Sequence, residues 1–389
     1  MGFRADLHVH IGATCDGRPV KIGASKFMTL ESVVAAARSN GIEVLGVVDF
    51  VRGIFDEAMQ HLASGVCVEH ADGGLWYDGV IVVPGFEVEI RRQGRNPVHF
   101  VCLFADFGKA YDMGRWLWSK QKNPSISCQR TYCEPAELLD VCLANEGVFW
   151  PAHAFTPHRG FYGTWERYQQ AFSKGSFHAI ELGLSADSAS ASYVHDTEGA
   201  HYVSASDAHS CGSIGREHMH IAGTASFGRI HRWLTAANTY SNIVIANHGL
   251  DPRLGKYYRS ACPKCKWVAR GVTQRANSCH SCGHPQLIQG VFDRIKQIGS
   301  EHPLLRPRPP YVYEVPLRFV PGVTLSGLRR LAASCGSNQH ELAVCSPELL
   351  TEVLGEGVAE YVYAAREGRL MVLEGGGGQC GRVLGIMRA

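Results

Sequence analysis

The sequence lacks a hydrophobic run long enough to cross a membrane. No stretch of about twenty consecutive apolar residues occurs, which excludes a membrane-spanning helix. The first residues, MGFRADLHVH, also lack the apolar core of a secretory signal and lead directly into a predicted strand. Charged residues make up only 19% of the chain and the formal net charge is +2, so overall charge says little about partners. We therefore expect a cytoplasmic protein that has no membrane partner.

The spacing of the cysteines excludes the disulfide framework of a small secreted protein. The chain has 14 cysteines, and those outside two closely spaced pairs are scattered singly from Cys15 to Cys380. In a cytoplasmic protein such cysteines are expected to be reduced and mostly buried thiols.

Short apolar runs alternate with helical stretches through the first 250 residues. The segment 29–41 is typical of a helix, because Thr29 is a suitable N-cap and Gly41 a suitable C-terminal stop. A second helix is predicted over 135–147. Strands are predicted over 5–11, 42–50, 80–90, 97–104, 148–155, 177–187 and 201–210. Strands that alternate with helices indicate parallel βαβ units, in a barrel or a wound sheet.

Metal-capable side chains stand at the ends of these predicted strands. They are His8, His10, Asp49, Glu87, His99, His153, Glu181, Asp207 and His209. The carboxyl ends of the strands form the active-site face of an α/β barrel. A structural histidine is ordinary at one strand end, whereas polar residues at nearly all of them favour a common site.

The spacing of these side chains indicates a metal site. His8 and His10 project to the same side of a strand, since side chains alternate with period two. The run SDAH adds Asp207 and His209 from a late strand. Such imidazoles and carboxylates can hold two or three divalent ions, which activate water and stabilise the leaving oxygen of a phosphoester. Asp16, six residues after His10, is either a further ligand or a turn residue of the run CDG.

Two CxxC pairs indicate a structural zinc site. The pairs are Cys262 with Cys265 and Cys279 with Cys282, and thirteen residues separate them. Four thiolates complete the tetrahedral coordination of one zinc ion and leave no open position for catalysis. The alternative is four free cysteines. Basic side chains around the pairs are expected to contact backbone phosphates without regard to sequence. They are Lys256, Lys264, Lys266, Arg270 and Arg275.

A basic block precedes the C-terminal part of the chain. Residues 252–310 hold eleven Lys and Arg against only Asp293 and Glu301, which favours a face that meets polyanions over an ordinary solvated face. The run 321–343 is typical of two short helices around a turn. It resembles a helix-hairpin-helix, which binds backbone phosphate, or is a plain helical hairpin. The last segment predicts strands around the glycines 375–378, a run that by itself is typical of a flexible turn.

The metal-capable set resembles that of the PHP (polymerase and histidinol phosphatase) phosphoesterases. Over nearly its full length the chain also resembles the endonuclease Q family. The motifs that carry this resemblance are GRPVKI, PAHAFTPHRGFYG, IELGLSAD, VSASDAHSCGSIGRE, ANHGLDPRLGKYYR, VPLRFVPGV and EGGGGQCG. The first of them, GRPVKI, is similar to the bacterial branch of that family. The last, EGGGGQCG, implies that the glycines 375–378 approach DNA or another domain closely.

The resemblance implies an α/β fold with a PHP-type distorted (β/α)7 barrel, a small zinc-binding insert and a mainly helical C-terminal domain. The implied domains are a phosphoesterase domain at 1–250, a four-cysteine zinc-binding domain at 251–290 and a DNA-binding domain at 291–389. The implied activity is that of a DNA repair endonuclease. It hydrolyses the phosphodiester on the 5′ side of uracil, hypoxanthine, xanthine or an abasic site, in double- or single-stranded DNA.

The resemblance also implies the residues of the active site. The implied metal ligands are His8, His10, Glu87, His99, His153, Asp207 and His209, with Asp16 and Asp49 as additional candidates. The expected catalytic residues are Asp207, Glu87 and His209. Two or three ions of Mg²⁺, Mn²⁺ or Zn²⁺ are expected there, in addition to one structural zinc per chain.

Three positions depart from the pattern of the family. Val51 and Arg52 follow Asp49 where a histidine is expected, Ala205 stands where asparagine is common, and His158 stands where an aromatic residue is commoner. The missing histidine would weaken one metal position or mark a lost activity. Three alternatives to the endonuclease therefore stay open: a small-molecule phosphatase, a DNA-binding protein with a decayed barrel, and a proofreading exonuclease.

Contacts to phosphate and to the damaged base need further residues. Arg159 or Arg216 would neutralise the phosphate. Inspection of a base requires its extrusion from the duplex into a pocket. Candidates to stack on the base, which are equally good core residues, are Phe155, Phe161, Tyr162 and Trp165.

Overall fold

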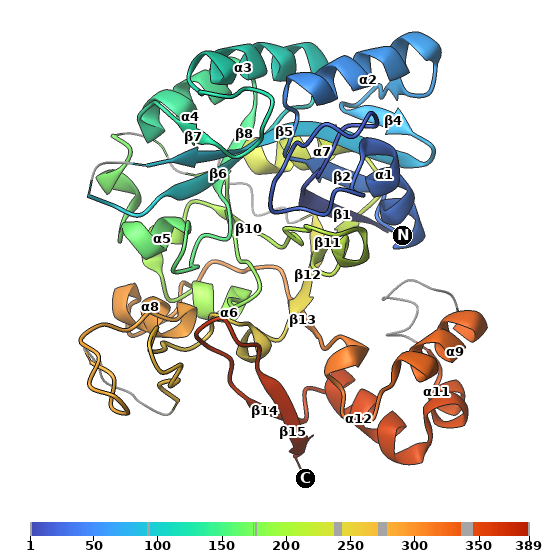
Figure 1. Cartoon of the computed structure of the whole chain (residues 1–389), viewed down its shortest axis with the longest axis vertical. Coiled ribbons are helices and arrows are strands. Elements are labelled where there is room, and N and C mark those ends of the chain that lie inside the picture. Colours follow the sequence, from blue (N-terminus) through green and yellow to red (C-terminus); the bar gives the residue numbers. More distant parts are fainter. Residues whose placement is uncertain are drawn as a thin grey trace.

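A large mixed sheet is the central feature of the computed structural model of this chain (Figure 1). The structure describes residues 2–91, 94–173, 175, 177–236, 243–270, 278–335 and 345–387. Across these ranges, none of the helices combines the length and apolar character that a membrane span requires.

The main sheet has the strand order β13-β12-β11-β1-β2-β5-β4-β3, with β6 and β7 also paired to β5 and β8 paired to β6. Its strands are β1 Gly2–Val9, β2 Val44–Val47, β3 Val68–Glu69, β4 Leu75–Tyr77, β5 Val80–Ile90, β6 Val98–Leu103, β7 Arg130–Thr131, β8 Val148–Pro151, β11 His218–Ala222, β12 Val244–Leu250 and β13 Tyr311–Glu314. Two further strand pairs are β9 Ala179–Glu181 with β10 His201–Val203, and β14 Leu370–Leu373 with β15 Arg382–Ile386.

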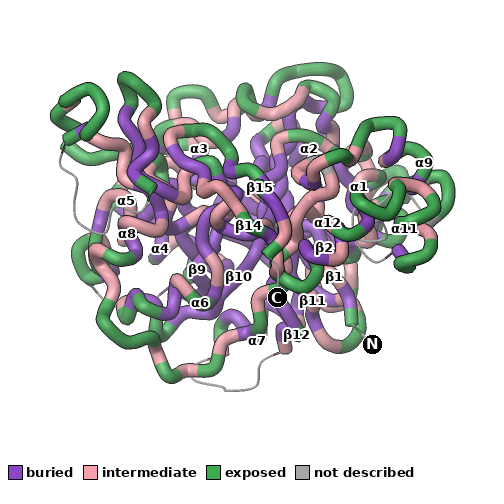
Figure 2. Tube along the Cα trace, turned by 90° about the horizontal axis from the view of Figure 1, so that it is seen from below, coloured by how far each residue is buried: buried purple, intermediate pink, exposed green. Residues whose placement is uncertain are grey.

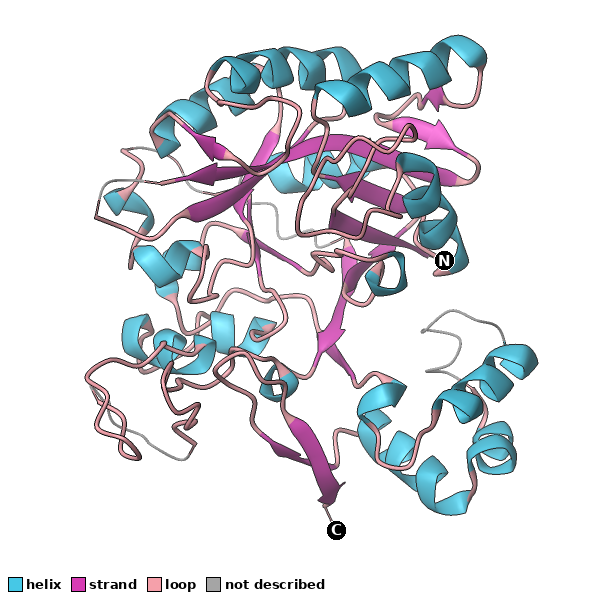
Figure 3. Cartoon of the chain, viewed as in Figure 1, coloured by secondary structure: helices cyan, strands magenta, loops and turns pink. Residues whose placement is uncertain are grey.

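Figure 3 shows helices along the main sheet and a further group of helices apart from it, at lower right. They are α1 Leu30–Ser39, α2 Arg52–Ser64, α3 Phe107–Ser119, α4 Pro135–Ala144, α5 Phe161–Thr164, α6 Ser188–Ala191, α7 Phe227–Thr235, α8 Val291–Ile298, α9 Leu325–Cys335, α11 Pro347–Leu354 and α12 Glu356–Arg366. Short 3-10 turns lie at Tyr168–Gln170, His195–Thr197, Cys211–Ser213, Pro252–Leu254 and Leu317–Phe319. The predicted cap of α1 is confirmed, because the Thr29 side chain accepts a hydrogen bond from the amide of Ser32.

The expectation of parallel βαβ units throughout is wrong, because the sheet is mixed. Strands β1, β2 and β5 are parallel, whereas β5–β6, β6–β8, β1–β11 and β11–β12 are antiparallel. The connection from β5 to β6 spans only residues 91–97, and a short connection can join antiparallel strands but not parallel ones.

Side chains of β1 alternate between an apolar cluster on one face of the strand and polar groups on the other. Phe3, Ala5 and Leu7 are buried in an apolar cluster that includes side chains of α7, while His8 faces the other side of the strand. Buried residues follow the strands, whereas green, exposed residues mark much of the outer helices (Figure 2). The pair β9–β10 brings the chain back to β1, where Val9 bridges to Ala208. The strand ends therefore converge on one interior region.

The C-terminal part contributes both to the main sheet and to a separate group of helices. Strand β13 pairs with β12 and so extends the main sheet. Helices α9, α11 and α12 form a separate group, at lower right in Figure 1, around a core of their own that includes Leu331, Leu350 and Val362. Of the predicted helices over 321–343, residues 336–343 lie outside the described residues.

The glycine run 375–378 lies in the turn between β14 and β15 and packs against the segment that follows β12. A Cβ atom on Gly375 would lie 2.4 Å from the carbonyl oxygen of Gly255, and one on Gly376 would lie 2.7 Å from that of Arg259. The predicted hairpin is confirmed. Of the two readings of its glycines, close backbone approach to another part of the chain is the one observed.

One cysteine differs from the expectation of reduced thiols. Cys345, which is buried beside α11, is disulfide-bonded. Cys15 and Cys380 are exposed, so the single cysteines are not uniformly buried either.

Candidate metal centre

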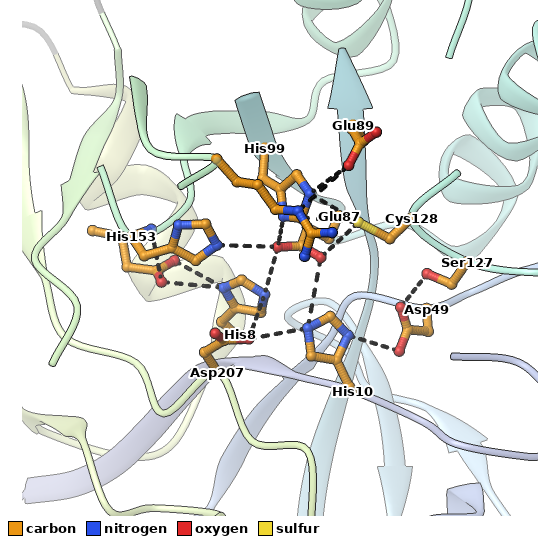
Figure 4. Close-up of polar contacts among 12 residues, drawn as sticks. His8, His10, Asp49, Glu87, Glu89, His99, Ser127, Cys128, His153 and Asp207 are labelled. Carbon is orange, nitrogen blue, oxygen red and sulfur yellow. Dashed lines mark hydrogen bonds and ion pairs between the residues drawn. The ribbon is translucent and has the colours of Figure 1, made fainter. Parts of the chain in front are cut away.

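Six of the predicted ligands meet around the carboxylate of Glu87 (Figure 4). The ligand atoms fall into two groups, each within 4.8 Å, and Glu87 belongs to both. The first group is His8, His10, Glu87 and Asp207, and the second is Glu87, His99 and His153. A carboxylate shared by two donor groups is the arrangement that bridges two metal ions.

In the first group, two imidazoles face two carboxylates at distances suited to a shared ion. The Nε2 atom of His8 lies 3.6 Å from Glu87 Oε1 and 3.6 Å from Asp207 Oδ1. The Nε2 atom of His10 lies 3.1 Å from the same Asp207 oxygen and 3.7 Å from Glu87 Oε2. The buried Nε2 of His8 has no hydrogen-bond partner, so its electron pair is directed at a position that a cation would fill.

In the second group, Glu87 Oε1 lies 2.5 Å from Nδ1 of His99 and 3.4 Å from Nε2 of His153. The other nitrogen of His99 lies 3.3 Å from Glu89 Oε2. The Nδ1 of His153 lies 3.1 Å from the hydroxyl of Thr156, which orients the ring.

Two buried carboxylates, on the side away from the centre, orient His8 of β1 and His10, which follows that strand. Glu181 Oε2 lies 3.0 Å from Nδ1 of His8, and Asp49 Oδ2 lies 2.9 Å from Nδ1 of His10. A carboxylate accepts a hydrogen bond from the Nδ1–H group, which keeps the proton on Nδ1 and leaves the electron pair of Nε2 toward the centre. The remaining oxygen of Asp49 accepts the hydroxyl of Ser127, so Asp49 stands behind His10 and not among the grouped ligand atoms.

The charges of the centre are strongly coupled. Burial by itself would raise the pKa of Glu87, but His99 and Lys21 hold it well below its usual value. Burial would likewise lower the pKa of His8, yet Glu181, Asp207 and Glu87 together raise it to about 10. The carboxylates therefore stay ionised and attract positive charge, whether protons or divalent cations.

Lys21 and Cys128 both contact the Oε2 atom of Glu87. The Lys21 ammonium lies 2.7 Å from this oxygen, with only 11% of its side chain exposed. The Cys128 thiol lies 2.9 Å from the same oxygen and 3.4 Å from Nε2 of His99. The expected histidine is absent near Asp49, where Val51 is buried against the core and Arg52 is exposed.

Backbone strain is concentrated at this centre. Asp207 has a φ of 47°, His153 a φ of 34° and Cys128 a φ of 54°, in the left-handed region that non-glycine residues rarely adopt. Such strain persists where the surrounding structure holds it and is common at functional sites.

Besides Asp49, two more predicted ligands lie apart from the grouped atoms, namely Asp16 and His209. Asp16 is exposed and its carboxylate accepts hydrogen bonds from Arg18 and Thr14. The ring of His209 lies 4.4 Å from that of His10, but its Nδ1 bonds the carbonyl oxygen of Asp207 and 38% of the side chain is exposed. His209 is thus a rim residue of the centre, and Asp16 is a turn residue beyond it.

The four cysteines of the CxxC pairs converge as a metal site requires. Sulfur atoms of Cys262 and Cys282 lie 3.7 Å apart, and those of Cys265 and Cys279 lie 3.5 Å apart. A zinc–sulfur bond of about 2.3 Å corresponds to sulfur separations of roughly 3.8 Å in a tetrahedron. The pKa of Cys265 is lowered to about 6, first by the backbone amide of Trp267, which favours the thiolate. The donor set and its geometry fit one zinc ion.

The basic block divides into surface and internal residues. Lys256, Lys264, Lys266 and Arg270 are exposed around the cysteine pairs, and Arg275 lies outside the described residues. By contrast Arg259 and Arg294 are buried. Arg308 donates to the carbonyl oxygen of Thr197 and covers the ring of Tyr202 at 3.9 Å. The expectation of one basic face is therefore wrong for these three arginines, because their guanidinium groups contact other parts of the protein.

The contacts of the phosphate-binding candidates and of the base-stacking candidates show where these side chains lie. Arg216 donates two hydrogen bonds to the carbonyl oxygen of Ser206, so its guanidinium supports the strand end that carries Asp207. Arg159 is 56% exposed and lies 3.6 Å from Glu89 at the mouth of the centre. The four aromatic candidates for base stacking are buried core residues. They are Phe155, Phe161, Tyr162 and Trp165.

Three residues of the centre had no role assigned from the sequence. Glu181 was placed at a strand end, and Lys21 lies inside the motif GRPVKI, but their partners are distant in the chain. Cys128 belongs to a loop without a metal-ligand spacing. Only for Glu181 did the sequence offer a signal, namely its position at the end of a predicted strand.

Comparison with known proteins places these features in a wider context. No family model matches the chain. It is 34% identical over 385 residues to the uncharacterized protein YqxK of Bacillus subtilis, covering 97% of this chain and 98% of the relative. It superimposes with a TM-score of 0.82 and 26% identity on the lesion-specific endonuclease PfuEndoQ of Pyrococcus furiosus, covering 98% of this chain and 95% of that one. A crystal structure of endonuclease Q with a 27-mer duplex substrate carrying an abasic lesion at the active site gives a TM-score of 0.80 at 26% identity, over 98% and 96% of the two chains.

Proposed function

Because this chain belongs to the endonuclease Q family and is a metal-dependent DNA endonuclease, we propose that it cuts DNA on the 5′ side of damaged nucleotides. The proposed lesions are uracil, hypoxanthine, xanthine and abasic sites. The observation that carries this proposal is the bridging position of Glu87 between two groups of metal-capable side chains, in a chain that matches endonuclease Q over its length.

The centre is proposed to hold two divalent ions, Mg²⁺, Mn²⁺ or Zn²⁺. One group of ligands is His8, His10, Asp207 and Glu87, and the other is Glu87, His99 and His153. Bound ions supply Lewis acidity for activation of water and for stabilisation of the leaving oxygen. The unpartnered Nε2 of His8 supports this assignment. A third ion is not part of the proposal, because Lys21 already neutralises the outer oxygen of Glu87.

Other residues of the chain are proposed to position the ligands and the substrate. Glu181 and Asp49 hold the proton on Nδ1 of His8 and His10, so that both Nε2 atoms face the centre. Arg159, exposed at the mouth, would pair with a backbone phosphate. His209 is proposed as a rim residue that contacts the DNA, and Asp16 has no ligand role in this scheme.

The four-cysteine segment is proposed as a zinc-stabilised DNA-binding insert. Its exposed basic side chains would contact phosphates on either side of the lesion. They are Lys256, Lys264, Lys266 and Arg270. We propose a distorted barrel that includes β13, an insert at 251–290, and a C-terminal region whose final hairpin packs back on the insert.

The deciding experiment is nicking of an end-labelled duplex that carries one deoxyuridine, deoxyinosine or abasic site. The full chain is incubated with Mg²⁺ or Mn²⁺, beside an undamaged duplex. We expect a single cut 5′ to the lesion, its loss in Asp207→Asn, and its retention in Asp16→Asn, which changes an aspartate outside the centre. Equal cutting of the undamaged duplex, or no cut with either metal, would overturn the proposal.

A further inference from the structure

A second histidine-rich group lies on the three strands β11, β12 and β13. His218, His248 and Glu314 each offer a ligand atom, and these atoms lie within 4.8 Å of one another. The group shares no residue with the metal centre or with the four cysteines. The run HMH in β11 is a second His-x-His motif, and neither of its histidines belongs to the ligand groups of the proposed catalytic centre.

The register of the strands places these side chains on one face of the sheet. His218 is directly opposite His248 in the antiparallel pair β11–β12, and the two rings stack with centroids 4.6 Å apart. In the parallel pair β12–β13, His248 is opposite Val312 and Leu250 is opposite Glu314. Because side chains alternate with period two, Glu314 projects from the same face as Val312 and His248. Its Oε1 lies 2.9 Å from Nδ1 of His248.

His218 presents an electron pair that the protein itself does not use. Its Nδ1 lies 3.0 Å from the carbonyl oxygen of Gly215, which can only accept, so Nδ1 carries the proton. The electron pair is therefore on Nε2, which is buried and has no hydrogen-bond partner. The residue is only 2% exposed, so no solvent satisfies this nitrogen. A buried unsatisfied polar atom is costly unless a ligand binds it.

We propose that His218, His248 and Glu314 bind one divalent transition-metal ion, with zinc as the best match. Two imidazoles and one carboxylate are a zinc ligand set that leaves a fourth position for water. The side chains of His248 and Glu314 are 12% and 20% exposed, so solvent and ions reach the group. The ion would tie β13, the first strand after the four-cysteine insert, to β11 and β12.

The neighbouring His220 provides a matched control for this site. It projects from the same face two residues along β11, and its ring centroid lies 6.3 Å from that of His248. It is not among the grouped ligand atoms. A change at His220 therefore alters the histidine content of this face without removing a proposed ligand.

The test counts zinc in the full-length protein across a series of buffered free zinc concentrations. Elemental analysis compares the wild type with His248→Gln, Glu314→Gln and His220→Gln, with circular dichroism as the check on folding. We expect one zinc ion fewer per chain in His248→Gln and Glu314→Gln, and no change in His220→Gln. If His248→Gln does not fold, the partly exposed Glu314→Gln decides.

The same zinc content in all four proteins at every free zinc concentration would overturn the proposal. The group would then be a hydrogen-bonded cluster only. Repeating the comparison in an Asp207→Asn background removes a ligand of the catalytic centre, and the difference of one ion is expected to persist there. The result is thus independent of the nicking assay.

Discussion

Replacement of Glu181 by glutamine tests how the metal centre is organised. Glu181 is fully buried and accepts hydrogen bonds from Nδ1 of His8, the indole of Trp150 and the amide of His153, at 3.0, 3.3 and 3.1 Å. Glutamine keeps the shape but has one oxygen for these donors and no charge to hold the Nδ1 proton of His8. Loss of such a supporting carboxylate weakens metal affinity about 10–100-fold, or roughly 1.4–2.7 kcal/mol.

The assay is the rate of nicking as a function of Mn²⁺ concentration. For Glu181→Gln we expect the half-maximal Mn²⁺ concentration to rise about 10–100-fold, with most of the maximal rate restored at saturating metal. Glu57→Gln is the control, because Glu57 is a buried glutamate in α2 that bonds the amide of Cys15 outside the centre. An unshifted Mn²⁺ dependence in a folded Glu181→Gln protein would refute the positioning role. A lost rate that metal does not restore would refute it equally.

Three further perturbations follow from the structure. In Lys21→Met the buried carboxylate of Glu87 loses the ammonium group that lies 2.7 Å from it. We expect the free energy of unfolding, measured with urea in the presence of chelator, to fall by about 3–5 kcal/mol and Mn²⁺ to restore part of it. An equal loss with and without metal would contradict this. In Cys262→Ser we expect one zinc ion fewer per chain by elemental analysis and weaker binding to duplex DNA, and an unchanged zinc content would speak against a four-cysteine site. Burial raises the pKa of Glu217 from 4.5 to about 8, so its contribution to stability is present below pH 4.5 and is lost as pH rises through 8. Glu217→Gln should therefore gain stability relative to the wild type across this window, by up to about 5 kcal/mol, and a difference that stays flat between pH 5 and pH 9 in urea unfolding would count against it.

Much of the centre was predictable because its residues obey local rules. His8 and His10 share a face through the period of two, and Glu87, His99 and Asp207 stand in or just after strands. The helix cap at Thr29 and the final hairpin were also predictable from neighbouring residues alone. Each of these features depends on a few consecutive residues, so the local sequence is enough to predict it.

Roles that depend on partners from distant elements were not predictable in this way. Asp49 occurs at a strand end like the ligands, yet its oxygens bond His10 and Ser127 from behind. Arg308 lies in a basic, proline-rich stretch that favours a surface position, yet it covers the ring of Tyr202. In both cases the residue type allowed the predicted role, but the neighbouring side chains in the folded protein give the residue a different one.

The sequence by itself determined which side chains face the interior of the strands, which strand ends carry metal-capable groups, and that four cysteines are spaced for zinc. Only the tertiary structure decided which of these groups touch. Glu181 meets His8 across 173 residues of chain, and the direction of each strand in the mixed sheet decides which ends come together. The physical reason is that side-chain direction is set by the local backbone, whereas distances between elements are set by how their apolar faces pack.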